Sequence, residues 1–302
     1  MDLTTSLQKL ASYRPQQTKK SRETFEKGVV LLRTDAFAKQ GEAGWDALER
    51  LTLAAFDQTE LKVADQCLQR ISNKFPQSPR VDLLQGIRME VTEPPEVALK
   101  YYDELLQEDS TRAAIWRRKA YVLRRMGKID RAVEELSAML DTFYTDVEGW
   151  LELADTYASC QQYTYALQSL SHALLLSPQN PFCFLQFAET AYLAGDITLS
   201  LKMFLVAVDM TDDEEGVPQD SIPVSLTLRA WYGVKLCTHR LITEPRHSSS
   251  SASQTPAPTT AKLANLDELS TERLRTAYLN VKGASPPNDH TSFMSTLATV
   301  IH

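Results

Sequence analysis

The chain has 302 residues, of which 43% are hydrophobic and 24% are charged, and these proportions are typical of a globular protein. Its ten glycines are too few for an all-β fold with many tight turns, and they favour a helical protein. The net charge of -7 disfavours nucleic acid as the main partner, because a phosphate-binding surface needs local positive charge.

Two short regions are expected at the start of the chain. Residues 1–20 should form a flexible N-terminus, and they contain no apolar core of signal-peptide length. Residues 21–44 include the run SRETFEKGVVLLRTDAFAKQ and should form an N-terminal capping helix.

Residues 45–214 repeat with a period of 34 and form five windows: 45–78, 79–112, 113–146, 147–180 and 181–214. Trp150 aligns with Trp116 one window earlier and with Phe184 one window later. Each window is predicted to form two short helices. In window 147–180 their packing residues are Trp150, Leu153, Ala154 and Tyr157 in the first helix and Ala166, Leu170 and Ala173 in the second. One helix pair cannot bury its own apolar face, so the pairs must stack.

The repeats are followed by less regular segments. Residues 212–215 are all acidic, and we expect a solvated loop because the alternating ligands of a calcium loop are missing. Residues 215–246 should form a degenerate further repeat, residues 247–261 a flexible Ser/Thr/Pro linker, and residues 262–302 C-terminal helices.

The repeated residues resemble the tetratricopeptide repeat, which places a Trp, a small residue, an aromatic residue, Ala and Pro at these distances. Five matches in one unbroken frame carry the resemblance. It implies an all-α fold, namely a right-handed superhelical solenoid of tetratricopeptide-like helix pairs with capping helices at both ends. Such an array is a scaffold for binding other proteins.

The stretch from Thr156 to Ala188 contains no Asp, Glu, Lys or Arg. It is not expected to span a membrane, because Gln161, Gln162 and the prolines would leave polar groups and a broken helix in lipid. Four cysteines without a CxxC pair indicate buried free thiols in a reducing compartment; they are Cys67, Cys160, Cys183 and Cys237. We therefore expect a cytoplasmic protein, and this leaves association with a membrane through partners open.

No motif of a common enzyme class is present, whether a phosphate-binding glycine loop, a dinucleotide fingerprint, a nucleophile elbow or a zinc-protease helix. The five histidines lack the spacing of metal ligands, and His172 should have a surface or packing role. We expect no enzymatic activity, no catalytic residue, no cofactor and no metal.

One charged constellation stands out. The stretch from Arg112 to Arg131 holds eight Lys or Arg residues and one acid. Helical spacing puts Trp116, Ala120 and Leu123 on the packing face and the basic side chains on the others. The candidate partner-binding residues of the concave face are Arg117, Arg118, Tyr121, Arg124 and Arg125, with Glu148, Glu152 and Asp155 on the matching face of the next unit.

Two interpretations of this constellation remain open. The arginines can pair with those acids or with water and only keep the helix soluble. Alternatively, they line a groove for an acidic or carboxylate-bearing helix or tail, with Tyr121 as an aromatic platform.

A more specific resemblance lies in four strings: FPQSPRVDLLQGIRME, YYDELLQEDSTRAAIWRRKAYVLRRMGK, FYTDVEGWLELADTY and NPFCFLQFAETAY. They resemble the family of the second subunit of the endoplasmic reticulum membrane protein complex. The resemblance implies a non-enzymatic scaffold within a hetero-oligomer, peripheral on the cytosolic face of the endoplasmic reticulum membrane. Its partners would be cytosolic segments of the other subunits, in a machine that inserts transmembrane segments, including tail anchors. The alternative is a free adaptor that binds short acidic or C-terminal peptides of client proteins.

Overall fold

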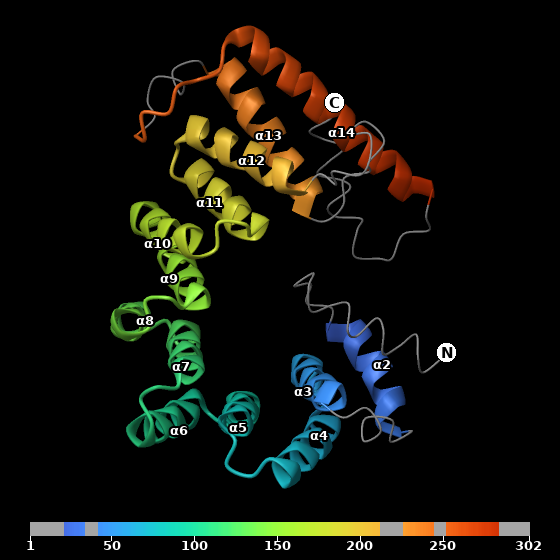
Figure 1. The fold of residues 1–302 in the computed structure, drawn as a ribbon, viewed down its shortest axis with the longest axis vertical. Coiled ribbons are helices and arrows are strands. Elements are labelled where there is room, and N and C mark those ends of the chain that lie inside the picture. The colour runs from blue at the N-terminus through green and yellow to red at the C-terminus, as the bar shows by residue number, and fades with distance from the viewer. Residues whose placement is uncertain (1–20, 34–41, 212–225, 245–251, 284–302) are drawn as a thin grey trace. The chain divides into compact units, whose positions relative to one another are not determined.

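The computed structural model describes residues 21–33, 42–211, 226–244 and 252–283, and within these ranges it contains thirteen α-helices and no strand. The expected all-α class is confirmed. In chain order the helices are α2 (Ser21–Arg33), α3 (Glu42–Asp57), α4 (Leu61–Lys74), α5 (Pro79–Thr92), α6 (Pro95–Glu108), α7 (Ala113–Arg125), α8 (Ile129–Thr142), α9 (Val147–Ser159), α10 (Tyr163–Leu176), α11 (Pro181–Leu193), α12 (Ile197–Thr211), α13 (Leu226–Thr243) and α14 (Thr260–Gly283) (Figure 1). The predicted N-terminal tail, the acidic loop and residues 284–302 of the predicted C-terminal helices lie outside the described residues.

The helix starts follow the period of the sequence repeat. The second helices of the five pairs begin at residues 61, 95, 129, 163 and 197, so each begins one full period after the one before. The first helices of the last four pairs begin at residues 79, 113, 147 and 181, with the same step. The repeat therefore sets where helices begin as well as where apolar residues lie.

Most pairs turn through a residue in the left-handed backbone region. At one position of the repeat frame, four of the five pairs have a residue with φ between 59 and 88°: Thr59, Gly127, Gln161 and Gly195. The amide of the residue that follows it donates to a carbonyl in the last turn of the first helix. In the third pair, Lys128 N–H donates to Leu123 O at 3.0 Å. In the second pair Glu93 has φ of -118° instead, because Pro94 follows and restricts the preceding residue to extended backbone.

The chain divides into two compact units, residues 1–135 and 136–302, with the boundary inside α8. In the first unit, α2 to α5 share a core of leucines, which includes Leu31, Leu48, Leu51, Leu68 and Leu84. The second core of this unit joins α5, α6 and α7 around Tyr102, a fully buried side chain. Gly86 on α5 admits this ring, because a Cβ at Gly86 would lie 2.2 Å from Tyr102 Cε1.

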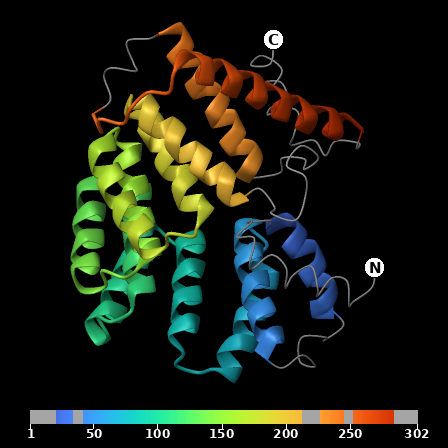
Figure 2. The ribbon, with the colours of Figure 1, turned by 45° about the horizontal axis from the view of Figure 1, so that its top comes forward.

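In the second unit, α9 and α10 pack on α11, and α11 packs on α12 (Figure 2). The core between α9, α10 and α11 includes Ala154, Leu170, Phe187 and Ala191. Another core joins α11 to α14, and its members include Leu185, Leu201, Phe204, Trp231 and Leu274.

The last helix pair is completed by a helix that follows the predicted linker. The Asp267 carboxylate of α14 accepts from Lys235 Nζ at 2.8 Å and from Thr238 Oγ1 at 3.0 Å, both on α13. The further repeat expected within residues 215–246 therefore supplies only α13, and its partner is α14. Since α14 begins at Thr260, it also includes the last two residues of the predicted linker, 247–261.

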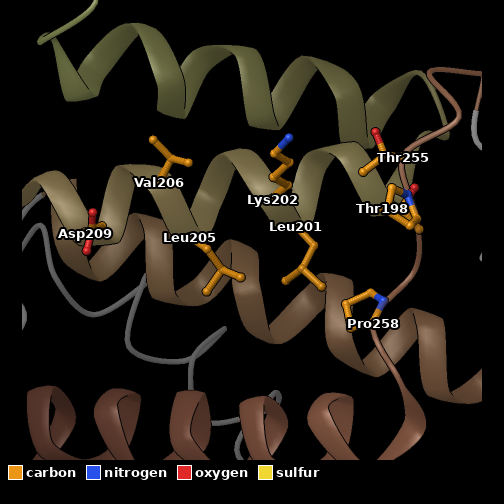
Figure 3. A pocket seen from close by; sticks show the side chains of 9 residues that line it. Thr198, Leu201, Lys202, Leu205, Val206, Asp209, Thr255 and Pro258 are labelled. Atoms are coloured by element: carbon orange, nitrogen blue, oxygen red, sulfur yellow. The ribbon is translucent and has the colours of Figure 1, made fainter.

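The described part of that linker lies along α12. Ser253 N–H donates to the buried Asp196 carboxylate at 3.0 Å. Residues 255–258 and α12 line an open hollow of about 510 Å³. Figure 3 shows Leu201, Leu205 and Pro258 at its wall. This part of the linker is therefore attached to the second unit by the hydrogen bond of Ser253.

We expect the thiols to differ strongly in reactivity. All four cysteines are free, and three of them are buried as expected. The expectation is wrong for Cys160, which is exposed because it lies at the end of α9. Burial raises the pKa of Cys67 to about 11 and that of Cys237 to about 12. Because the thiolate is the reactive species, titration of the native chain with a disulfide reagent at pH 8 should show rapid reaction of Cys160 alone. All four should react in denaturant, and rapid native reaction of Cys237 would contradict the packing of α12 on α13.

None of the helices in the described part of the chain is both long enough and apolar enough to cross a bilayer.

Candidate protein-interaction surface

The basic residues predicted from the sequence all lie on α7, where three of them surround one tyrosine. The guanidinium carbon of Arg118 is 4.7 Å from the centre of the Tyr121 ring, and those of Arg125 and Arg124 are 5.9 and 6.0 Å from it. A guanidinium at this distance is attracted to the ring face. We call Arg117, Arg118, Tyr121, Arg124 and Arg125 the basic cluster.

The basic cluster exists because the other side of α7 is buried. The buried residues of α7 are Ile115, Lys119, Ala120, Val122 and Leu123. Their spacing leaves the remaining faces of the helix to the charged side chains and to Tyr121. Tyr121 and Arg124 are half-buried and Arg125 is exposed, so a partner can reach this edge of the cluster.

Arg118 is a half-buried arginine of the cluster that is paired with a buried acid. Its Nε donates to Glu90 Oε1 of α5 at 2.9 Å, and its Nη2 donates to Glu90 Oε2. Tyr102 Oη of α6 donates to Glu90 Oε1 at 2.6 Å. The Glu90 side chain is only 3% exposed. One carboxylate therefore joins three helices, and we call Glu90, Tyr102 and Arg118 the α5–α7 triad.

The electrostatics of the triad follow from this burial. Burial, and then the adjacent Glu90 carboxylate, raise the pKa of the Tyr102 hydroxyl. Burial alone would lower the pKa of Arg118, but the charge and hydrogen bonds of Glu90 outweigh it and raise that pKa. Tyr102 therefore remains a neutral donor and Arg118 a cation, which is the combination that satisfies a buried carboxylate.

A second buried cation lies beside the cluster. Lys119 is 8% exposed, and its Nζ lies 2.8 Å from Asp103 Oδ1 of α6 and 2.5 Å from Glu135 Oε1 of α8. Sequence reasoning did not select Lys119, Glu90 or Tyr102. Glu90 had one available signal, because it follows Leu83 and Ile87 at the spacing of an apolar face.

The acidic candidates lie on α9, in the second unit. Asp155 Oδ1 accepts from Gln186 Nε2 of α11 at 2.5 Å. A similar contact joins α11 to α13, where Glu189 accepts two hydrogen bonds from Arg229 at 2.5 and 2.7 Å. Asp155 thus helps to join neighbouring first helices. The basic cluster belongs to the first unit and the acids to the second, so a single surface made of all eight residues stays a prediction.

The described residues contain no group of three or more His, Cys, Asp or Glu side chains that could hold a metal ion. The ion pairs and hydrogen bonds described above join neighbouring helices. To a bound partner these side chains can offer charge and hydrogen bonds.

Residues 47–202 match the model of a family described as the EMC2 TPR-like repeat domain. ER membrane protein complex subunit 2-A of Xenopus laevis is 31% identical over 244 residues, which cover 80% of this chain and 77% of that protein. The chain belongs to the family of ER membrane protein complex subunit 2. TPR repeat protein oca3 of Schizosaccharomyces pombe is 30% identical over 216 residues, 69% of this chain and 72% of that protein. Among solved structures, a thermophilic TPR protein of Thermus thermophilus has a TM-score of 0.47 at 15% identity and covers 63% of this chain and 98% of its own.

Membership of the subunit 2 family confirms the resemblance carried by the four sequence strings, and it identifies the helix pairs as tetratricopeptide-like. The matched range contains α7 and α9, so all eight candidate residues lie within the family's repeat domain. It ends in α12, before α13 and α14.

Proposed function

We propose that this chain is a non-enzymatic scaffold subunit of an ER membrane protein complex, located on the cytosolic face of the membrane. In this role it supports a machine that inserts transmembrane segments, including tail anchors. The observation that carries the proposal is the family match, which begins within the first helix pair and ends within the fifth. It is supported by the relatives, several of which are named as subunits of that complex.

The basic cluster is the surface on which we place one contact with the complex. Arg124, Arg125 and Tyr121 present positive charge beside an aromatic ring, which suits an acidic or carboxylate-bearing helix or tail. Arg118 holds the Tyr121 ring in position for this contact, because its ion pair with Glu90 fixes the guanidinium next to the ring. The partners would be cytosolic segments of the membrane subunits, in a hetero-oligomer.

Reversing two charges of the cluster tests this contact. We expect Arg124→Glu/Arg125→Glu to reduce the recovery of membrane subunits by about tenfold or more, because like charges across an interface cost several kcal/mol. Both residues lie outside the buried face of α7, so the helical circular dichroism spectrum should not change. Recovery is measured by purifying the tagged full chain from detergent-solubilised membranes and quantifying the proteins that accompany it.

Lys62→Glu/Lys100→Glu is the matched control, because it reverses two exposed charges on α4 and α6. Normal recovery with the Arg124/Arg125 variant would remove the contact from the proposal. If the wild-type chain returned with a changing set of soluble clients that added peptide displaces, the scaffold role would be replaced by that of a free adaptor.

A further inference from the structure

The outer face of α10 is exposed and carries no charge. Four residues at the helical spacing i, i+3, i+7 and i+10 form what we call the uncharged α10 face; they are Tyr165, Gln168, His172 and Leu175. Leu175 is 81% exposed and Tyr165 is 55% exposed. This face lies within the longer stretch, residues 156–188, that contains no Asp, Glu, Lys or Arg. In the second unit, α9 and α11 pack against other faces of α10 (Figure 1).

The fold itself does not require an uncharged face at these positions, as the sister helices of the array show. At the equivalent places, one repeat earlier, α8 carries Arg131, Glu134, Ala138 and Asp141. Two repeats earlier α6 carries Val97, Lys100, Glu104 and Gln107, and one repeat later α12 carries Leu199, Lys202, Val206 and Asp209. The charged residues among these are all exposed. The lack of charge on α10 therefore needs a cause other than helix packing.

The aromatic residues of the face are held in place. The Tyr165 ring lies 5.3 Å from that of Tyr157 on α9, and the His172 ring stacks on Trp150 at 4.4 Å with an interplanar angle of 19°. Beside Tyr165, residues 161–165 and Ala194 line a hollow of about 320 Å³, next to Leu193, which is 60% exposed. Rigid aromatic rings with apolar neighbours and a shallow hollow are features of the buried core of protein interfaces.

We propose that the uncharged α10 face docks the apolar side of a helix from another subunit of the complex. This inference rests on the proposed scaffold function and adds a second contact surface to it. The occupant should carry little charge on its contacting side, because a charged group pressed on this face would lose its hydration and meet no counter-ion there. Residues 165–175 extend over about 15 Å of helix axis, which matches roughly three turns of a partner helix.

Two other occupants fit the charge pattern less well. An anionic membrane surface attracts Lys and Arg, and the uncharged α10 face has neither. A second copy of this chain would bring together two molecules that each carry a net charge of -7, which repel one another.

The sister helices supply a test that preserves the fold. In Tyr165→Arg/Leu175→Asp, the face receives the charges that α8 carries at Arg131 and Asp141. We expect only a small fall in the unfolding midpoint, because the Tyr165 ring is 55% exposed and its contact with Tyr157 is the packing that the variant loses. We also expect one identified membrane-complex subunit to fall by about tenfold or more relative to the others when the tagged full chain is purified from detergent-solubilised membranes. Ile242→Asp/Leu269→Asp is the control, since these apolar side chains of α13 and α14 are 47% and 41% exposed.

A photo-crosslinking residue at position 175 then identifies the occupant. Crosslinking to an uncharged helical segment of the subunit that the variant loses would support the proposal. Wild-type recovery of every subunit by the variant would overturn it and leave the scaffold function intact. Recovery of no membrane subunit by the wild-type chain would overturn both.

Two further measurements use the purified chain and can also overturn the proposal. Flotation with phosphatidylserine vesicles that the variant abolishes would assign the face to lipid. A wild-type dimer that light scattering shows to become a monomer in the variant would assign it to self-association.

Discussion

Replacing Glu90 by alanine should lower the free energy of unfolding of the first unit by about 3–5 kcal/mol, the usual cost of removing one partner from a buried ion pair. The Arg118 guanidinium would keep its charge beneath the Tyr121 ring without the carboxylate that neutralises it. Tyr102 would lose the acceptor of its buried hydroxyl group. Urea unfolding of the full chain measures the loss, and hydrogen exchange should locate it in α5, α6 and α7.

The control for Glu90→Ala is another ion pair between neighbouring helices. Arg88 of α5 donates to both carboxylate oxygens of Asp65 of α4, at 2.6 and 3.3 Å, but its side chain is 42% exposed. An exposed pair contributes about 0–1 kcal/mol, so Arg88→Ala should have little effect. Equal losses from the two variants would mean that burial of the Glu90 carboxylate is not what makes the triad important.

Replacing Gly86 by alanine should also destabilise the first unit, by about 2 kcal/mol or more. Alanine has the higher helix propensity by about 1 kcal/mol. The clash outweighs this gain, because the new Cβ would lie 2.2 Å from Tyr102 Cε1 and 2.6 Å from Tyr102 Oη. Tyr102 cannot move aside without breaking its hydrogen bond to Glu90. The measurement is again the urea unfolding transition.

A double-mutant cycle separates the steric cause from a general effect on the helix. In a Tyr102→Leu background the ring is absent, so Gly86→Ala should become neutral or slightly stabilising. A loss that persists in that background would show that Gly86 is needed for another reason, such as the approach of the α5 and α6 backbones.

The fold was largely predictable because similar residue types recur every 34 residues along the sequence. Leu153 and Ala154 are buried, as their positions in the repeat predict. Trp150 differs because it is only half-buried. Its indole N–H donates to Tyr144 O at 2.9 Å, and the His172 ring stacks on its ring. Trp116 makes the equivalent hydrogen bond to Ser110 O at 3.0 Å. This role of the tryptophan as a tie to the preceding loop cannot be read from hydrophobic spacing.

The candidate site was only partly predictable. Helical spacing on α7 predicts which basic residues gather on one side, and the structure brings them around Tyr121. The same spacing gives no information about the acid that Arg118 meets, because Glu90 lies on another helix, far away in the sequence. The sequence also does not predict the pairing of α13 with α14, because the residues between these helices do not follow the repeat.

The position of the linker has a consequence for the evolution of the chain. It lies inside a helix pair, between α13 and α14, and not between one pair and the next. Both of its ends are held by helices that pack on each other through Asp267, so added residues change the cost of closing the loop only slowly. Insertions and deletions at this place can therefore accumulate without shifting the register of the array. A fragment that ended at Glu244 would instead uncover the core around Trp231 and Leu241, and we would expect it to aggregate.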